Sequence, residues 1–128
     1  LVALHMCCVN VESPEFHATW LGLIGCRFVH HPPFSRFRVS VDREHPVTAD
    51  VGEFEIEDEL YITEPVGEPV ETLASALHEG ARHPMVTVRE AGRGRVCYIA
   101  LGHDGRAQHH PAFQRLVVQA ARWAGRME

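Results

Sequence analysis

The pattern of apolar and polar residues predicts two helices with a series of short strands between them. In residues 14–24, apolar side chains recur at helical spacing after Ser13, a good N-cap, and a proline that suits the first turn. A glycine then ends the segment. Residues 111–124 also begin with proline and carry an apolar stripe at i, i+3, i+4 and i+7. We therefore expect a helix in each segment.

The remaining apolar segments are short and have strand patterns. Residues 37–41, for example, alternate between apolar and polar side chains. The predicted strands are Leu1–His5, Phe37–Val41, Phe54–Ile62, Val70–Leu77, Pro84–Arg89 and Val96–Leu101. The segments 29–34, 64–68 and 78–83 are predicted to be loops or turns. Helices and strands in this order predict an α/β fold, with residues 1–128 forming a single domain.

One polar residue interrupts the apolar face of the predicted strand 54–62. Glutamates occupy one face of this strand, whereas Asp58 falls among the apolar residues of the other face. Either the strand bulges at this point, or Asp58 is buried with a partner. The sequence leaves both explanations open.

The segment Val96–Leu101 is apolar without alternation, which is typical of a strand buried on both faces in a parallel sheet. It ends in the turn Gly102-His103-Asp104-Gly105. Ligands of open α/β sheets bind outside the carboxyl ends of the strands. This turn is therefore the best single candidate for the edge of an active site.

Composition excludes several classes of function. The net charge of −5 argues against nucleic acid or an anionic membrane surface as partner, and no apolar run approaches the roughly 20 residues of a membrane span. The chain has no lysine, so Schiff-base chemistry and a phosphate-loop lysine are excluded within it. Ten histidines favour metal binding or acid–base chemistry.

The four cysteines indicate a reducing compartment. They lack metal-type or redox-type spacing, and we expect reduced, mostly buried thiols of a cytoplasmic protein. The start of the chain lacks a basic leader and does not have the pattern of a signal peptide. It also lacks an initiator methionine and begins within an apolar strand, so we expect an upstream part to be missing.

Four segments carry a recognisable pattern in order: LVALH at the start, WLGLIGCRFVHHPP, HPVTADVGEFEIEDELY, and GRGRVCYIALGHD followed by the final helix ending in RWAG. Together these segments resemble the ThuA-like, or trehalose-utilisation, family. The resemblance implies a flavodoxin-like three-layer sandwich, similar to class I glutamine amidotransferases. It also implies that amino-terminal βα units of that fold are absent from this chain.

The resemblance does not extend to amidotransferase chemistry. A nucleophile elbow needs small flanking residues, and Cys7 has no glycine within reach. We therefore do not expect a functional glutamine amidotransferase.

If the fold is as implied, four groups meet at one edge: His5, His31, Glu59 and His103. The expected catalytic residues are His103, Glu59 and Asp104, with Asp104 or Asp58 fixing a histidine tautomer. His5, His31 and His103 are expected ligands of a divalent metal such as zinc. The expected substrate-binding residues are Arg89, Asp58 and Tyr61. Side chains converging on one point would favour chemistry or metal binding over a plain binding domain.

Each residue also has a purely structural interpretation. His5 could bond a backbone carbonyl at its strand end, His31 could be a plain loop residue, and Glu59 could continue a solvated acidic face. Arg89 could form a salt bridge with Glu90 or Glu57, and Tyr61 could be a packing residue. These alternatives stay open at the level of sequence.

The resemblance implies a small-molecule carbohydrate as partner, namely trehalose-type disaccharides or their keto derivatives. Acid–base chemistry, with or without a metal, would suit a sugar isomerase or hydrolase. A non-catalytic ligand-binding or interaction domain is the alternative. A third is an inactive fragment whose exposed sheet edge pairs with a partner strand or a second copy.

Overall fold

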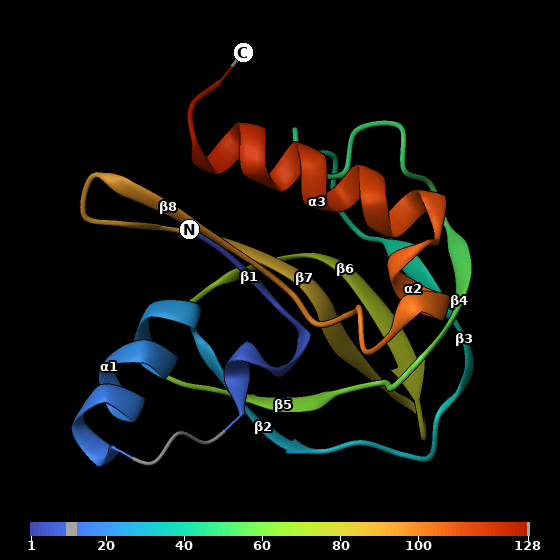
Figure 1. Cartoon of the computed structure of the whole chain (residues 1–128), viewed down its shortest axis with the longest axis horizontal. Helices are drawn as coiled ribbons and strands as arrows, with labels where there is room; N and C mark the ends of the chain where they lie inside the picture. The colour runs from blue at the N-terminus through green and yellow to red at the C-terminus, as the bar shows by residue number, and fades with distance from the viewer. Residues whose placement is uncertain (10–12, 128) are drawn as a thin grey trace.

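The computed structural model describes residues 1–9 and 13–127 as a mixed α/β fold (Figure 1). The elements in chain order are β1 (Val2–Leu4), the 3₁₀ helix η1 (His5–Cys8), α1 (Pro14–Ile24), β2 (Cys26–His30), β3 (Ser35–Val41), β4 (Phe54–Asp58), β5 (Ile62–Pro65), β6 (Glu71–His78), β7 (Ala81–Ala91), β8 (Gly94–Ile99), α2 (Gly105–Gln108) and α3 (Pro111–Ala124).

The main sheet has six strands in the order β1-β8-β7-β6-β3-β4, and β2 and β5 form a separate antiparallel pair. Among these strands only β1 and β8 pair in parallel, with Val2 opposite Cys97 and Leu4 opposite Ile99. The α/β class is therefore confirmed. The expectation of a parallel sheet around residues 96–101 is wrong in part, because β8 has the antiparallel strand β7 on its other side. Its burial on both faces is confirmed, since residues 96–101 are all buried.

Helices cover both faces of the sheet around β8. In Figure 1, α3 lies along one face, and α1 with the β2–β5 pair lies on the opposite side. The guanidinium of Arg89 on β7 donates to the carbonyl of Gly22 in α1 at 2.7 Å, which ties that helix to the sheet. The core between these layers contains the largest fully buried side chains, among them Ile24, Ile56, Leu73, Met85, Ile99, Leu101 and Leu116.

Both predicted helices are confirmed with their predicted bounds. Ser13 accepts a hydrogen bond from the backbone N–H of Phe16, and Gly25 ends α1 with φ +95°. The imidazole of His110 caps α3 by accepting from the N–H of Ala112 at 3.1 Å. Local sequence signals therefore account for both ends of α1.

The single strand predicted over residues 54–62 is wrong, because the structure breaks it into two strands of different sheets. β4 ends at Asp58, and β5 begins at Ile62 and pairs with β2. Asp58 is completely buried, and its carboxylate accepts hydrogen bonds from backbone N–H groups. The register of β4 against β3 is regular, so buried partners and not a bulge explain this acidic residue.

Three predicted loops are shorter than expected. Residues 78–83 are not a loop, because β6 and β7 join through a tight turn at Glu79 and Gly80, both with positive φ. Strand β2 runs through His30, and β5 extends through Pro65 into the predicted turn. The first strand ends one residue early, because His5 begins η1. Alternating polarity is weak evidence where a strand lies at the surface, which is why these ends were missed.

The state of the cysteines agrees with the prediction made from their spacing. All four cysteines are free thiols, three of them buried. Among the described residues, no helix has the length and apolar character needed to span a bilayer.

Candidate functional site

His5 occupies a strained turn at the carboxyl end of β1. Its φ of +39° lies in the left-handed region, where side chains other than glycine cost roughly 1–3 kcal/mol. The other described non-glycine residues with positive φ are exposed, whereas His5 is 5% exposed. Packing holds the turn, since the hydroxyl of Tyr98 donates to the His5 carbonyl at 2.6 Å. The ring of Tyr61 stacks on the imidazole at 3.9 Å between centroids.

The tautomer of the neutral His5 ring is set by the backbone. Nδ1 lies 2.9 Å from the carbonyl oxygen of Ala100. A carbonyl can only accept, so Nδ1 carries the hydrogen. The second nitrogen, Nε2, faces Glu59 at 3.3 Å from Oε2. When the ring is neutral, Nε2 therefore carries a lone pair, and this lone pair is directed at the carboxylate of Glu59.

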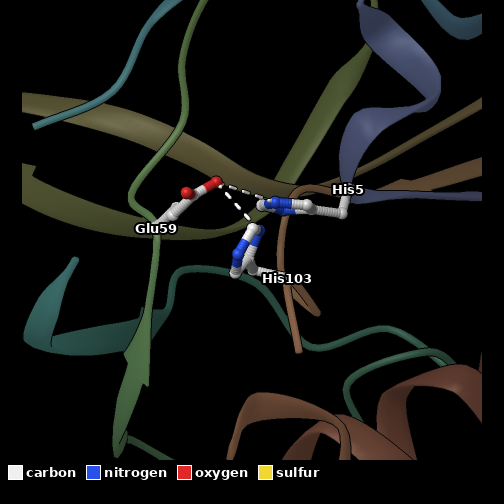
Figure 2. Close-up of side chains that lie close together, drawn as sticks. All are labelled: His5, Glu59 and His103. Atoms are coloured by element: carbon white, nitrogen blue, oxygen red, sulfur yellow. Dashed lines mark hydrogen bonds and ion pairs between the residues drawn. The ribbon is translucent and has the colours of Figure 1, made fainter. Parts of the chain in front are cut away.

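Glu59 is the centre of the cluster and lies in the segment that connects β4 and β5. Figure 2 shows one carboxylate oxygen facing both His5 and His103, which come from different ends of the chain. Oε2 lies 3.3 Å from His5 Nε2 and 3.1 Å from His103 Nδ1. The other oxygen, Oε1, lies 3.5 Å from His31 Nε2. The carboxylate is 15% exposed, so most of its surface contacts these groups and not water.

His31 has the same arrangement of ring nitrogens as His5. Its Nδ1 lies 2.7 Å from the carbonyl of Pro32, which fixes the hydrogen on Nδ1 and leaves Nε2 facing Glu59. Tyr61 also stacks against His31, with 5.9 Å between ring centroids. When both rings are neutral, His5 and His31 therefore direct acceptor nitrogens at one carboxylate.

His103 is placed by the buried carboxylate of Asp58. Asp58 accepts from the backbone N–H groups of Gly102 at 2.7 Å and His103 at 3.0 Å. It also accepts from the N–H of Glu59 at 2.9 Å, so one carboxylate holds both loops of the site. Gly102 has φ +110°, and a Cβ there would lie 2.8 Å from the Phe113 ring. Glycine is required at this position for both reasons.

A cavity of about 860 Å³ opens above the cluster. Its polar lining includes His5, Glu59 and His103, with Gln108 and Gln114 at its side. The apolar lining comprises Leu4, Met6, Phe113, Val117 and Val118. The side chain of His103 is 42% exposed, against 6% for His5, so His103 is the histidine that a ligand in the cavity meets first.

The structure therefore brings His5, His31, Glu59 and His103 together, as the sequence predicted. Tyr61 also lies there, lining the cavity as well as packing against both rings. Burial and the charge of Glu59 raise the pKa of Tyr61 to about 12. Its phenol is therefore protonated at neutral pH and can donate a hydrogen bond, but it is not a base there.

Three predicted site residues have other positions or roles. Arg89 lies outside the cavity, bonded to the Gly22 carbonyl, and forms neither expected salt bridge. Asp104 caps α2 and pairs with Arg106, which lowers the pKa of its carboxyl to about 2. Asp58 is fully buried and bonded to backbone, so it positions the loops and does not face a substrate. The two expected tautomer partners are replaced by backbone carbonyls.

Sequence reasoning missed the two glutamines of the cavity wall. Gln108 donates from its side chain to the Gly102 carbonyl at 3.0 Å, next to the site. Gln114 donates to the Gln108 carbonyl at 3.2 Å. Their signal in the sequence is an amide three residues after GHDG and another on the polar side of the last helix, and neither is specific.

The cysteines lie away from this chemistry. Neither Cys7 nor Cys8 lines the cavity. The Cys7 carbonyl accepts from the Trp20 indole at 2.7 Å, and the Cys8 thiol lies 2.9 Å from the Tyr98 hydroxyl. Hydrogen bonding to Cys26, opposed by burial, lowers the pKa of Cys8, but its thiol is enclosed by the core.

The whole-chain match to a known family decides the identity. The family model ThuA, described as trehalose utilisation, matches residues 1–124. The chain belongs to the ThuA family. The match covers every residue of the cluster around Glu59, as well as both helices that flank the sheet.

Solved structures show the same fold. A ThuA-like protein from Bacteroides uniformis ATCC 8492 is similar with a TM-score of 0.75, 22% identity and 96% coverage of this chain. A ThuA-like protein from Parabacteroides merdae ATCC 43184 has a TM-score of 0.80, 19% identity and the same coverage. The chain spans 57% and 59% of the lengths of these two proteins.

A cytoplasmic protein from Salmonella typhimurium LT2 is similar as well, with a TM-score of 0.60 and 16% identity. The match covers 98% of this chain and 52% of that one. No curated protein matches this ThuA chain. At these identities the likeness establishes the fold and nothing about the reaction.

Proposed function

We propose that this ThuA chain acts on trehalose-type disaccharides or their keto derivatives through the Glu59 cluster. The observation that carries the proposal is a carboxylate contacted by three histidines at the floor of a cavity of about 860 Å³. That volume lies within the range of about 300–1,000 Å³ that is usual for small-molecule sites. The family description, trehalose utilisation, supplies the substrate class.

The acid–base pair of this proposal is His103 with Glu59. When the carboxylate of Glu59 accepts the hydrogen of His103 Nδ1, the lone pair of His103 is on Nε2, the nitrogen directed away from Glu59. A base in this position can remove a proton next to a sugar carbonyl or activate water. Isomerisation and hydrolysis both need such a step, and both remain part of the proposal.

The cavity lining suits one sugar ring or two. Apolar side chains such as Leu4, Phe113 and Val117 would pack against the C–H faces of the rings. Gln108, Gln114 and the protonated Tyr61 phenol supply hydrogen-bonding groups for hydroxyls. Arg89 and Asp104 have no place in this proposal, because both are engaged elsewhere.

The test is binding and turnover of trehalose and of keto-disaccharides by the protein and three variants. His103→Ala and Glu59→Gln should lower kcat/KM by about 100-fold or more, the usual contribution of a general acid or base. His30→Ala is the matched control, since this exposed histidine neighbours His31 but lies outside the cluster. Equal turnover by the protein and by both cluster variants would refute the proposal.

The alternative is a non-catalytic ligand-binding domain. The cavity lining favours it to some degree, since five of its side chains are apolar. Under this alternative, the protein binds the sugar without converting it, and Phe113→Ala weakens binding more than His103→Ala. The same titration and turnover assays therefore separate the two functions.

Three broader proposals concern the setting of the domain. The arrangement of α3, the sheet and α1 supports a flavodoxin-like, amidotransferase-like sandwich for the family fold. A cytoplasmic location is proposed from the free thiols and from the similar cytoplasmic protein. A second copy pairing along an edge strand, β1 or β4, is the proposed oligomer, and sedimentation of the purified protein tests it.

A further inference from the structure

The unusual feature of the Glu59 cluster is that, with His5 and His31 neutral, its donors and acceptors do not match without a cation. The Nδ1 hydrogens of His5 and His31 are committed to the carbonyls of Ala100 and Pro32. In neutral rings, both Nε2 lone pairs then face the carboxylate of Glu59. Lone pairs facing a carboxylate repel it, and the cluster is largely withdrawn from water. Something positive between them would remove this repulsion.

The distances fit a shared cation better than direct ion pairs. A charged nitrogen that donates to a carboxylate usually lies about 2.7–2.9 Å from the oxygen. Here the separations from Oε2 are 3.3 Å for His5 and 3.1 Å for His103. Ligands about 2.0–2.1 Å from a tetrahedral zinc ion lie about 3.3 Å from each other. One ligand atom from each of His5, Glu59 and His103 lies within 4.8 Å of the other two.

The surroundings also have the features of a metal site. Histidine ligands commonly donate their second nitrogen to a backbone carbonyl, which fixes the tautomer and the ring orientation. His5 has this arrangement, with its ring further held under Tyr61. The cavity opens on the side of the exposed His103, where a fourth position could take a substrate oxygen.

We infer that His5 Nε2, a carboxylate oxygen of Glu59 and His103 Nδ1 bind a divalent transition-metal cation, with zinc the best match. His31 Nε2 lies beside the other oxygen of Glu59 and supports the site as a fourth or outer contact. Two imidazole nitrogens and one carboxylate oxygen are a ligand set of catalytic zinc, with one position open. A cation there polarises a carbonyl or hydroxyl oxygen of a bound sugar. The acid–base role proposed above for His103 belongs to the metal-free site, because His103 is a ligand when the cation is bound.

This inference concerns the same cavity as the proposed function but rests on the donor atoms alone, so its test needs no sugar. The protein is stripped with a chelator and titrated by calorimetry with zinc and then with manganese. Thermal unfolding is followed in parallel, because a ligand that binds only the folded protein raises Tm. Cobalt serves as a spectroscopic probe, since its visible spectrum reports coordination by nitrogen and oxygen in a site with four or five ligands.

The expected result is one zinc ion per chain, a rise in Tm, and a cobalt spectrum that zinc abolishes. His103→Ala and Glu59→Gln should weaken zinc binding by at least about 100-fold, since even outer contacts of a metal site are worth about 10–100-fold. His31→Ala should weaken it by about 10-fold, and His30→Ala should leave it unchanged. His103 is the most exposed member of the cluster, so its loss is the variant least prone to unfolding.

Two results would overturn the inference. The first is the absence of stoichiometric binding of either ion. The second is zinc binding that His103→Ala and Glu59→Gln leave unaltered, which would place the ion on other histidines of the chain. Zinc binding by a protein that neither binds nor converts sugars would refute the proposed function and leave the metal site standing. Sugar turnover that chelation leaves unaffected would support the proposed function and refute a part for the cation in it.

Discussion

Replacing Asp58 with asparagine should destabilise the protein more than any conservative change on its surface. The carboxylate is completely buried and accepts three backbone N–H groups. Oδ2 accepts from Gly102 at 2.7 Å, and Oδ1 accepts from His103 at 3.0 Å and from Glu59 at 2.9 Å. Asparagine has nearly the same shape, so the change tests hydrogen bonding and charge and leaves packing almost untouched.

The magnitude follows from counting these bonds. Hydrogen bonds to a charged group contribute about 1.5–3 kcal/mol each, and neutral ones about 0.5–1.5 kcal/mol. In Asp58→Asn one oxygen becomes an NH₂ group, so one hydrogen bond is lost. The new NH₂ donor then faces a backbone N–H, which is also a donor. The other two bonds weaken to the neutral range. Relief from burying a charge offsets part of the loss, which leaves a decrease in the free energy of unfolding of about 2–4 kcal/mol.

The assay is urea unfolding followed by circular dichroism, with Glu57→Gln as the matched control. Glu57 is one residue away on β4, and its ion pair with Arg36 at 3.0 Å is exposed. Exposed pairs contribute about 0–1 kcal/mol, so this control should change stability by less than 1 kcal/mol. The affinity for zinc should also fall in Asp58→Asn, because the loops of Glu59 and His103 lose their common anchor.

A decrease below about 1 kcal/mol for Asp58→Asn would refute the reasoning, since it would mean that the three hydrogen bonds contribute no more than an exposed pair. Equal effects of Asp58→Asn and Glu57→Gln would have the same meaning. The slope of the urea transition must stay the same in both variants for the comparison to hold.

The remaining predictions concern the supports of the site and one exposed carboxylate. Gly102→Ala should lower the free energy of unfolding by several kcal/mol, because the position has positive φ and a Cβ there would meet the Phe113 ring. Gly80→Ala is the control, with positive φ but open space, and should lower it by about 1 kcal/mol. Equal decreases in urea unfolding would count against the contact with Phe113. Tyr98→Phe should cost about 1–2 kcal/mol in the same assay, because the His5 carbonyl loses its buried donor, and an unchanged midpoint would contradict this. The pKa of Asp104 is lowered to about 2, so its stabilising contribution is present above pH 4 and is lost as pH falls through 2. The difference in free energy of unfolding between the protein and Asp104→Asn should therefore shrink between pH 5 and pH 2.5. A constant difference would refute the assignment.

Local signals in the sequence were sufficient for some parts of the fold. The helix at residues 14–24 was predicted with its ends because a serine cap, a first-turn proline and a terminal glycine act within a few residues of each other. The burial of residues 96–101 was predicted from their unbroken apolar character. The strand ends at residues 62–65 and 78–81 were missed because surface strands of mixed polarity have no such signal.

The position of Asp58 shows where local reasoning stops. Its place in an apolar row indicated either a bulge or a buried partner, and the sequence did not separate the two. The partners are the N–H groups of Gly102 and His103, more than forty residues further along the chain. Nearly every residue has a backbone N–H group, so the residue pattern does not indicate which ones bind Asp58. These two hydrogen bonds therefore could not be predicted from the sequence.

The sequence by itself determined the α/β class, both helices, the buried strand before GHDG, the free thiols and the four residues of the Glu59 cluster, the last through family motifs. Only the tertiary structure decided which nitrogen of His5 and of His31 faces Glu59, because the deciding partners are backbone carbonyls. It also decided that Arg89 and Asp104 are engaged elsewhere. The physical reason is that periodicity and caps act over a few residues, whereas the bonds from His5 to Ala100 and from Gly102 to Asp58 join groups 95 and 44 positions apart.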